Sequence, residues 1–198
     1  MGRAGKIAAG CSAWACLVAA CDAPERSGAG PESHARAAPE ALRAWRTIES
    51  VLTHPRCANC HPSDGIPKQG DESEPHAQGV RGGPTGRGVG AFACAGCHRD
   101  FNLGPPPRAP GAPGWRIPSE EMPLVFEGRS SGELCRQLRD PSRNGGRDAA
   151  ALLEHVAHDA LVHWGFEPGP GRTPVPIPQA EFVAAVRTWI DAGCGCPP

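Results

Sequence analysis

The sequence predicts an all-α domain with long loops. Apolar residues recur at helical spacing, no stretch alternates as a strand would, and glycine and proline are unusually common. Gly (26) and Pro (23) make up a quarter of the 198 residues, Phe and Trp together number ten, and there is no Tyr. A chain so rich in turns and so poor in large side chains buries little apolar surface by itself. Either much of it lacks a packed core, or a non-protein group completes that core.

Four helices are predicted in chain order. The first spans residues 40–53, where apolar side chains recur at three- and four-residue steps and Pro55 ends the pattern. Ser130 and Glu133 form a capping box that opens a second helix, through Leu138. The third is capped by Asp148 and runs to about residue 160, and the fourth spans about 179–192 before Gly193. We expect the first and last helices to pack together.

Two segments between these helices are predicted to be loops. Residues 62–93 are dense in glycine and proline, and residues 104–118 are rich in proline. Trp115 is the one large side chain that could anchor the second loop.

The N-terminus has the pattern of an export signal. Arg3 and Lys6 precede a 14-residue apolar stretch, which is too short to span a bilayer comfortably, so residues 1–20 are predicted to be a signal peptide. The run Val18-Ala19-Ala20-Cys21 resembles a bacterial lipobox, which predicts a lipid anchor at Cys21; the alternative is ordinary cleavage after Ala20. Residues 21–39 are predicted to be a flexible tether, which leaves 40–198 as the folded domain.

The pattern C-x-x-C-H occurs twice, as Cys57-Ala58-Asn59-Cys60-His61 and as Cys94-Ala95-Gly96-Cys97-His98. It is the attachment pattern of c-type haem, and roughly 0.02 copies are expected by chance in a chain of this composition. Cysteines three residues apart on a helical turn reach the two vinyl groups at one porphyrin edge, and the adjacent histidine then points at the iron. The sequence therefore predicts two covalent c-type haems, with Cys57, Cys60, Cys94 and Cys97 as thioether residues and His61 and His98 as proximal ligands.

Two other uses of these cysteines were weighed. A zinc site would combine the four cysteines as thiolate ligands, but 33 residues separate the pairs, and the matched histidines would have no role. A thioredoxin-like redox pair requires a βαβ context, which the sequence lacks.

The chain resembles a group of bacterial di-haem cytochrome c proteins, often labelled isoquinoline 1-oxidoreductase subunits. The resemblance covers about 140 residues, from Cys57 to Cys196, and depends on both haem motifs and on the segments Pro113-Gly114-Trp115, Glu121-Met122-Pro123, Glu133-Leu134-Cys135-Arg136, Asn144-Gly145-Gly146 and Glu154-His155. It implies a cytochrome c-like helical domain whose loops wrap two haems, and a role as electron carrier for a molybdenum-containing hydroxylase. No molybdopterin site is visible in the sequence.

The distal iron ligands have three candidates. Met122 is the only methionine besides the initiator, lies in a Met-Pro loop like the distal methionine of small c-type cytochromes, and is assigned first to the His98 haem. His155, at the edge of an apolar helix face, is a candidate for the other iron. His76, in the loop between the motifs, is a second candidate and could fold back over either haem. His158 falls on the solvated side of its helix, and the remaining histidines are expected at the surface: His34, His54 and His163.

Three further cysteines follow the haem motifs. A disulfide from Cys135 to one of Cys194 and Cys196 is expected in an oxidising compartment, whereas pairing of Cys194 with Cys196 would be strained.

These features predict a periplasmic, lipid-anchored carrier that takes single electrons from a dehydrogenase or hydroxylase and passes them to an acceptor cytochrome or oxidase. The expected function is therefore electron transport and not catalysis. The alternatives are a small di-haem peroxidase and, more remotely, a zinc-stabilised interaction module. The net charge of −1 gives no electrostatic footprint for nucleic acid.

Overall fold

The computed structural model describes residues 31–198 of the chain, with side chains from residue 39 onward. The expected signal peptide and the lipid attachment at Cys21 lie outside the described residues, and so does the side chain of His34. The helices are α1 (Pro31–Leu52), α2 (Pro55–Ala58), α3 (Ser131–Arg139), α4 (Ala149–His158), α5 (Ala160–Phe166) and α6 (Gln179–Asp191). Two 3₁₀ turns, η1 (Gly90–Phe92) and η2 (Cys94–Gly96), and a two-residue antiparallel ladder, β1 (Lys68–Gln69) with β2 (Glu74–Pro75), lie in the loops. The described chain is thus mostly helical, as predicted, although it does contain this one short ladder.

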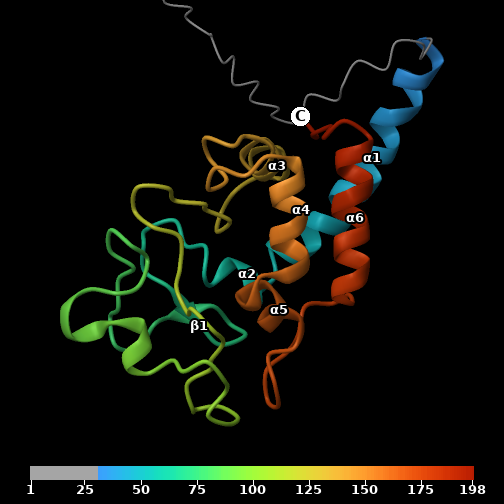
Figure 1. Cartoon of the computed structure of the whole chain (residues 1–198). Helices are drawn as coiled ribbons and strands as arrows, with labels where there is room; N and C mark the ends of the chain where they lie inside the picture. The colour runs from blue at the N-terminus through green and yellow to red at the C-terminus, as the bar shows by residue number, and fades with distance from the viewer. Residues whose placement is uncertain (1–30) are drawn as a thin grey trace, which may run out of the picture.

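The core lies among the long helices. Figure 1 shows α1, α3, α4 and α6 gathered on one side of the molecule, while the loops after α2 form the other side. The α1–α6 pair makes the most extensive contact between elements, as expected, and its centre is the pair Trp45–Trp189, with ring centroids 5.6 Å apart. Apolar side chains at three- and four-residue steps on both helices are fully buried in this interface, which explains why the two helices pack along their length.

The capping predictions are confirmed. The Ser130 hydroxyl accepts a hydrogen bond from the Glu133 main-chain N–H, and the Glu133 carboxylate accepts one from the Ser130 main-chain N–H. Asp148 caps α4 by accepting from the Ala151 N–H. Gly193 follows α6 with a φ of 84°, a left-handed conformation that glycine adopts without strain.

A disulfide between Cys135 on α3 and Cys196 ties the C-terminus to the helical side, and it selects one of the two pairings left open by the sequence. The Trp189 indole N–H donates to the Gly195 carbonyl at 3.0 Å, next to the disulfide. The segment after α6 is therefore fixed to the core.

Two helix boundaries differ from the prediction. Helix α1 begins at Pro31, nine residues earlier than expected, so the second half of the segment predicted as tether is helical. That part has no apolar periodicity, but Ala, Glu and Arg favour helix intrinsically, and this propensity was overlooked. The helix expected to end near residue 160 ends at His158, because Asp159 accepts from the N–H groups of Leu161 and Val162 and opens a separate helix, α5.

Candidate functional site

The first C-x-x-C-H motif is built on helical structure. Cys57 lies on the single turn of α2, which Pro55 opens at its first position and His54 caps by accepting from the Arg56 N–H. Cys57 packs against the main hydrophobic core, and Cys60 follows the helix end. Neither cysteine is in a disulfide. This turn therefore holds the Cys57 thiol against the core, with Cys60 three residues further on.

A returning segment, residues 124–127, holds His61 from one side. The His61 Nδ1 lies 2.7 Å from the Leu124 carbonyl oxygen, and the imidazole stacks on the Phe126 ring with centroids 3.8 Å apart. The main-chain carbonyl of His61 also accepts from the N–H groups of Phe126, at 2.9 Å, and Glu127, at 3.2 Å. Both the backbone and the ring of His61 are therefore fixed by a segment more than sixty residues away.

This contact determines the protonation pattern of His61. A carbonyl oxygen only accepts hydrogen bonds, so Nδ1 must carry the proton and donate it. Burial lowers the pKa of His61 to about 4, so the ring is neutral at pH 7 and its Nε2 has a free lone pair. A neutral imidazole with Nδ1–H bonded to a main-chain carbonyl is the arrangement that orients a histidine as a metal ligand.

The second motif repeats the arrangement in a different setting. Cys94 lies in the 3₁₀ turn η2, Cys97 follows it, and neither is in a disulfide. The His98 Nδ1 lies 2.8 Å from the Pro110 carbonyl oxygen, and its ring stacks on Trp115 with centroids 4.4 Å apart and planes 4° apart. Burial again lowers the pKa of the histidine. His98 is therefore also a neutral Nδ1–H tautomer with a free Nε2.

The segments that supply these partners were missed in the sequence, apart from the role of Trp115 as a loop anchor. Leu124, Phe126 and Pro110 carry no pattern of their own. Their one signal is indirect: each C-x-x-C-H motif is followed by a proline-containing segment.

The environment of the first pair disfavours thiolate chemistry. Burial raises the pKa of Cys57 to about 12 and that of Cys60 to about 11. Reactive C-x-x-C pairs have lowered pKa values, so the surroundings of Cys57 and Cys60 are opposite to those of a redox dithiol. Within residues 31–198, no three or more His, Cys, Asp or Glu side chains converge as ligands of a metal ion would, so geometry gives no support to the alternative zinc site.

The second motif is surrounded by exposed apolar side chains. The exposed large hydrophobic residues of the described chain all lie within six residues of it, with exposed fractions between 42 % and 64 %: Val89, Phe92, Phe101 and Leu103. Cys97 is exposed as well. A contiguous segment with this many exposed apolar residues indicates a surface that something apolar covers.

Aromatic rings link the two motifs. Trp115, stacked on His98, meets the buried Trp164 of α5 edge-on at 5.1 Å. Arg56 precedes Cys57 in the chain, and its guanidinium lies over the Trp164 ring, 5.8 Å from the ring centroid. Cys94 also acts electrostatically on Cys60 and raises its pKa. The two motifs are therefore neighbours in space.

The candidate distal residues divide between the two histidines. The His76 ring lies 6.2 Å from the His98 ring, and His155 interacts electrostatically with His61. His155 also lies 3.5 Å from the Asp159 carboxylate. Met122 is half-buried, and its main-chain N–H bonds to Ser119. His158 and His163 are exposed, as predicted, whereas His54 is half-buried and caps α2.

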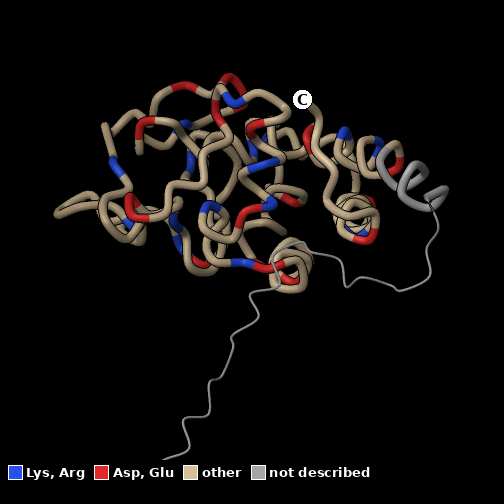
Figure 2. Tube along the Cα trace, turned by 90° about the horizontal axis from the view of Figure 1, so that it is seen from above, with Lys and Arg blue, Asp and Glu red and all other residues tan. Residues whose placement is uncertain are grey.

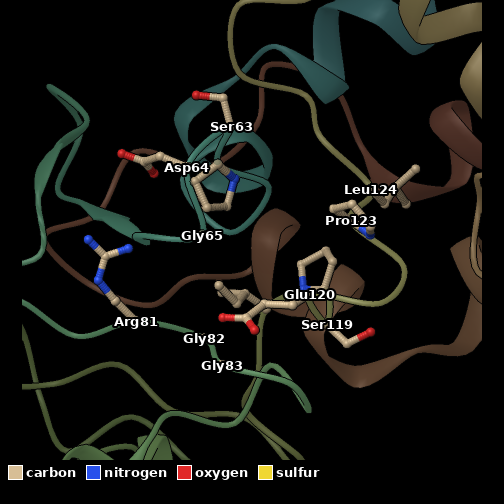
Figure 3. Close-up of a pocket in the computed structure, with 13 residues that line it drawn as sticks. Ser63, Asp64, Gly65, Arg81, Gly82, Gly83, Ser119, Glu120, Pro123 and Leu124 are labelled. Atoms are coloured by element: carbon tan, nitrogen blue, oxygen red, sulfur yellow. The ribbon is translucent and has the colours of Figure 1, made fainter.

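A small cavity adjoins the first motif. It has a volume of about 190 Å³ and lies between the loop after His61 and residues 117–124. Figure 3 shows Arg81, Asp64 and Glu120 around it. This mixture of charges and apolar side chains indicates no single class of ligand, so we assign it none.

The distribution of charged residues along the described chain indicates no further binding site. Figure 2 shows acidic and basic residues interspersed along the described chain. No helix among residues 31–198 is long and apolar enough to cross a bilayer.

Comparison with known proteins adds no relative. No family model, no curated protein and no solved structure matches this chain. The functional argument therefore depends on the geometry of the two motifs.

Proposed function

We propose that the protein is an exported di-haem c-type cytochrome that transfers single electrons between a periplasmic or membrane oxidoreductase and the respiratory chain. One observation carries this proposal: both C-x-x-C-H histidines donate Nδ1–H to a main-chain carbonyl and keep Nε2 free. If the two motifs had arisen by chance, their histidines would not be expected to share this orientation, because the local structures around them differ.

The residues present fit the proposed group. Cys57, Cys60, Cys94 and Cys97 are outside any disulfide and so remain available for thioether bonds to haem. The protein leaves the apolar side chains near the second motif exposed. A porphyrin bound at this motif would contact these side chains and remove them from water. A haem bound at each motif would supply one-electron chemistry at its iron.

The chain's own residues then control that chemistry. Leu124 and Pro110 accept the Nδ1 proton of each proximal histidine, which increases the basicity of Nε2 and fixes the ring direction. Phe126 and Trp115 hold the two rings by stacking. The first motif is partly buried, whereas Cys97 of the second motif is exposed, so the second motif gives a redox partner the more accessible edge.

The proposal extends to location and partners. The apolar N-terminal stretch supports export, and the lipobox-like run at Cys21 supports a membrane anchor. A dehydrogenase or molybdenum hydroxylase is the proposed donor, and a cytochrome or oxidase the proposed acceptor.

The test is to express the full chain in a bacterium that matures c-type cytochromes. We expect a red protein that retains haem on a denaturing gel and yields two haems per chain in a pyridine haemochrome assay. The C60S and C97S variants should each change the attachment of one haem only. A colourless product, or one that contains zinc, contradicts the proposal.

A further inference from the structure

His76 occupies a fixed position, although it lies in a loop of 32 residues between the two predicted motifs. The β1–β2 ladder pairs Lys68 with Pro75, directly before His76. The Lys68 N–H donates to the Asn59 carbonyl of the first motif at 2.9 Å, and the His76 N–H donates to the Pro67 carbonyl at 3.1 Å. The first motif therefore anchors the hairpin that carries His76.

This hairpin presents His76 to the second motif. The ring centroids of His76 and His98 are 6.2 Å apart, with ring planes at 66°. Two imidazoles bound to opposite faces of one metal, with metal–nitrogen bonds of about 2 Å, have ring centres roughly 6 Å apart. The observed separation therefore matches that of two axial ligands, and the tilt between the ring planes excludes parallel stacking.

Both rings also have a nitrogen to offer. The His98 Nδ1 is bonded to Pro110, which leaves its Nε2. The Nδ1 of His76 is buried and has no hydrogen-bond partner among the described residues. Buried polar atoms are nearly always satisfied, so an unpartnered nitrogen on a ring that neighbours His98 points to a ligand of its own. The Gln78 side chain also hydrogen-bonds to the His76 ring, and Nδ1 remains the nitrogen without a partner.

The other two candidates lie elsewhere. His155 interacts electrostatically with His61 and not with His98. Met122 precedes Pro123 and Leu124, which line the cavity beside the first motif, and Leu124 is the partner of His61. The chain around Met122 is therefore fixed to the first motif, although the sequence favoured this residue as ligand of the second.

We infer that His76 is the distal axial ligand of the iron held by His98, so that the second haem has two histidine ligands. This inference rests on the proposed function, because it requires a haem at Cys94 and Cys97. The sequence alone does not decide which of the two haems His76 would ligate, and the structure favours the second.

The test compares H76A, H76M and M122A in the full haem-loaded chain, with H158A as a matched control at an exposed histidine. We expect H76A to keep two haems per chain while one of the two turns from low-spin to high-spin and gains the ability to bind carbon monoxide. Added imidazole should restore the low-spin spectrum. H76M should raise the reduction potential of one haem, because a His/Met iron has a higher potential than a bis-histidine iron. M122A and H158A should leave the spectrum of the second haem unchanged.

The failures are distinguishable. If H76A retains two low-spin haems that do not bind carbon monoxide, or if M122A produces the high-spin haem instead, the assignment of His76 is wrong while the di-haem function stands. If the wild-type chain carries no haem, both proposals are wrong.

Discussion

The two C-x-x-C-H motifs are placed in very different parts of the molecule, yet both histidines are oriented in the same way. The first motif lies on α2 and packs against the helical core, and the second lies in 3₁₀ turns among loops whose apolar side chains are exposed. In both, a carbonyl from a distant segment accepts Nδ1–H and an aromatic ring stacks on the imidazole. The shared elements are thus the ones that orient a metal ligand, and the local secondary structure is free to vary.

This contrast also suggests a division of roles. A covalent attachment keeps a group bound even where the pocket is shallow, which the open second motif requires. The first motif is partly buried and packs Cys57 against the core, so it contributes to the fold itself. Each prediction below tests one side of this comparison.

The largest expected difference comes from removing each attachment pair. The C57A/C60A and C94A/C97A variants should each lose one haem. The first pair should cost about 2 kcal/mol or more of unfolding free energy beyond the second, because Cys57 packs against the core. Denaturant unfolding followed by circular dichroism measures this difference. Equal losses would mean that the first motif is no more integrated into the fold than the second.

A smaller effect is expected at Gly111, next to the carbonyl that orients His98. A Cβ at this position would overlap the main-chain oxygens of Arg99 and Phe101, so G111A should displace Pro110 and cost about 1–3 kcal/mol. The spectrum of the second haem should become heterogeneous while the first is unchanged. The control is G96A inside the motif, where a Cβ meets open space. A normal second-haem spectrum in G111A would show that the Pro110 contact does not orient His98.

The third prediction concerns the pH dependence of the helical side near His61. A hydrogen bond from His155 lowers the pKa of Asp159 well below its ordinary value, and the carboxylate also caps α5 and pairs with Arg116. A lowered carboxyl pKa gives stability that is complete above the unfolded pKa, near 4, and is lost as the pH falls further. D159N should therefore cost about 1 kcal/mol at pH 7 and progressively less below pH 4.

The measurement is the unfolding free energy of D159N and wild type between pH 3 and pH 7. D148N, which alters the cap of the neighbouring helix α4, controls for the general effect of replacing a capping aspartate. A difference between D159N and wild type that stays constant with pH would contradict the assigned role of the charge.

The smallest effect on stability is expected at the exposed rim of the second motif. Phe101 is 64 % exposed, so F101S should change the unfolding free energy by less than about 0.5 kcal/mol. If the rim covers a haem face, F101S should nonetheless lower the reduction potential of that haem by admitting water, and it should leave the other potential unchanged. A redox titration distinguishes the two haems. Two unchanged potentials would indicate that Phe101 does not touch the second haem.

Much of the helical side could be predicted because its signals are local. The capping box at Ser130, the Asp148 cap, Gly193 and the apolar steps of α1 and α6 act within a few residues, and each marked its element correctly. The helical start at Pro31 and the separate helix α5 were missed. The first part of α1 has residues of high helix propensity but no apolar periodicity. At the second site, Asp159 ends α4 and caps α5, so one helical pattern is divided into two helices.

The site was predictable only in part, for a physical reason. C-x-x-C-H is a contiguous pattern, so Cys57, Cys60, Cys94, Cys97, His61 and His98 can be read from the sequence. The partners of the histidines act through main-chain carbonyls and ring faces at Leu124, Pro110, Phe126 and Trp115, and a carbonyl carries no residue signature. The position of His76 likewise depends on a two-residue ladder, too short to leave a strand pattern.

The most direct test of the central claim is intact and peptide mass spectrometry of the mature protein from a host that matures c-type cytochromes. The account predicts a mass equal to that of the mature polypeptide, with any lipid, plus two haems. One haem should lie on the peptide containing Cys57 and Cys60, and the other on the peptide containing Cys94 and Cys97. Unmodified cysteines in both peptides, in a folded protein from such a host, would contradict it.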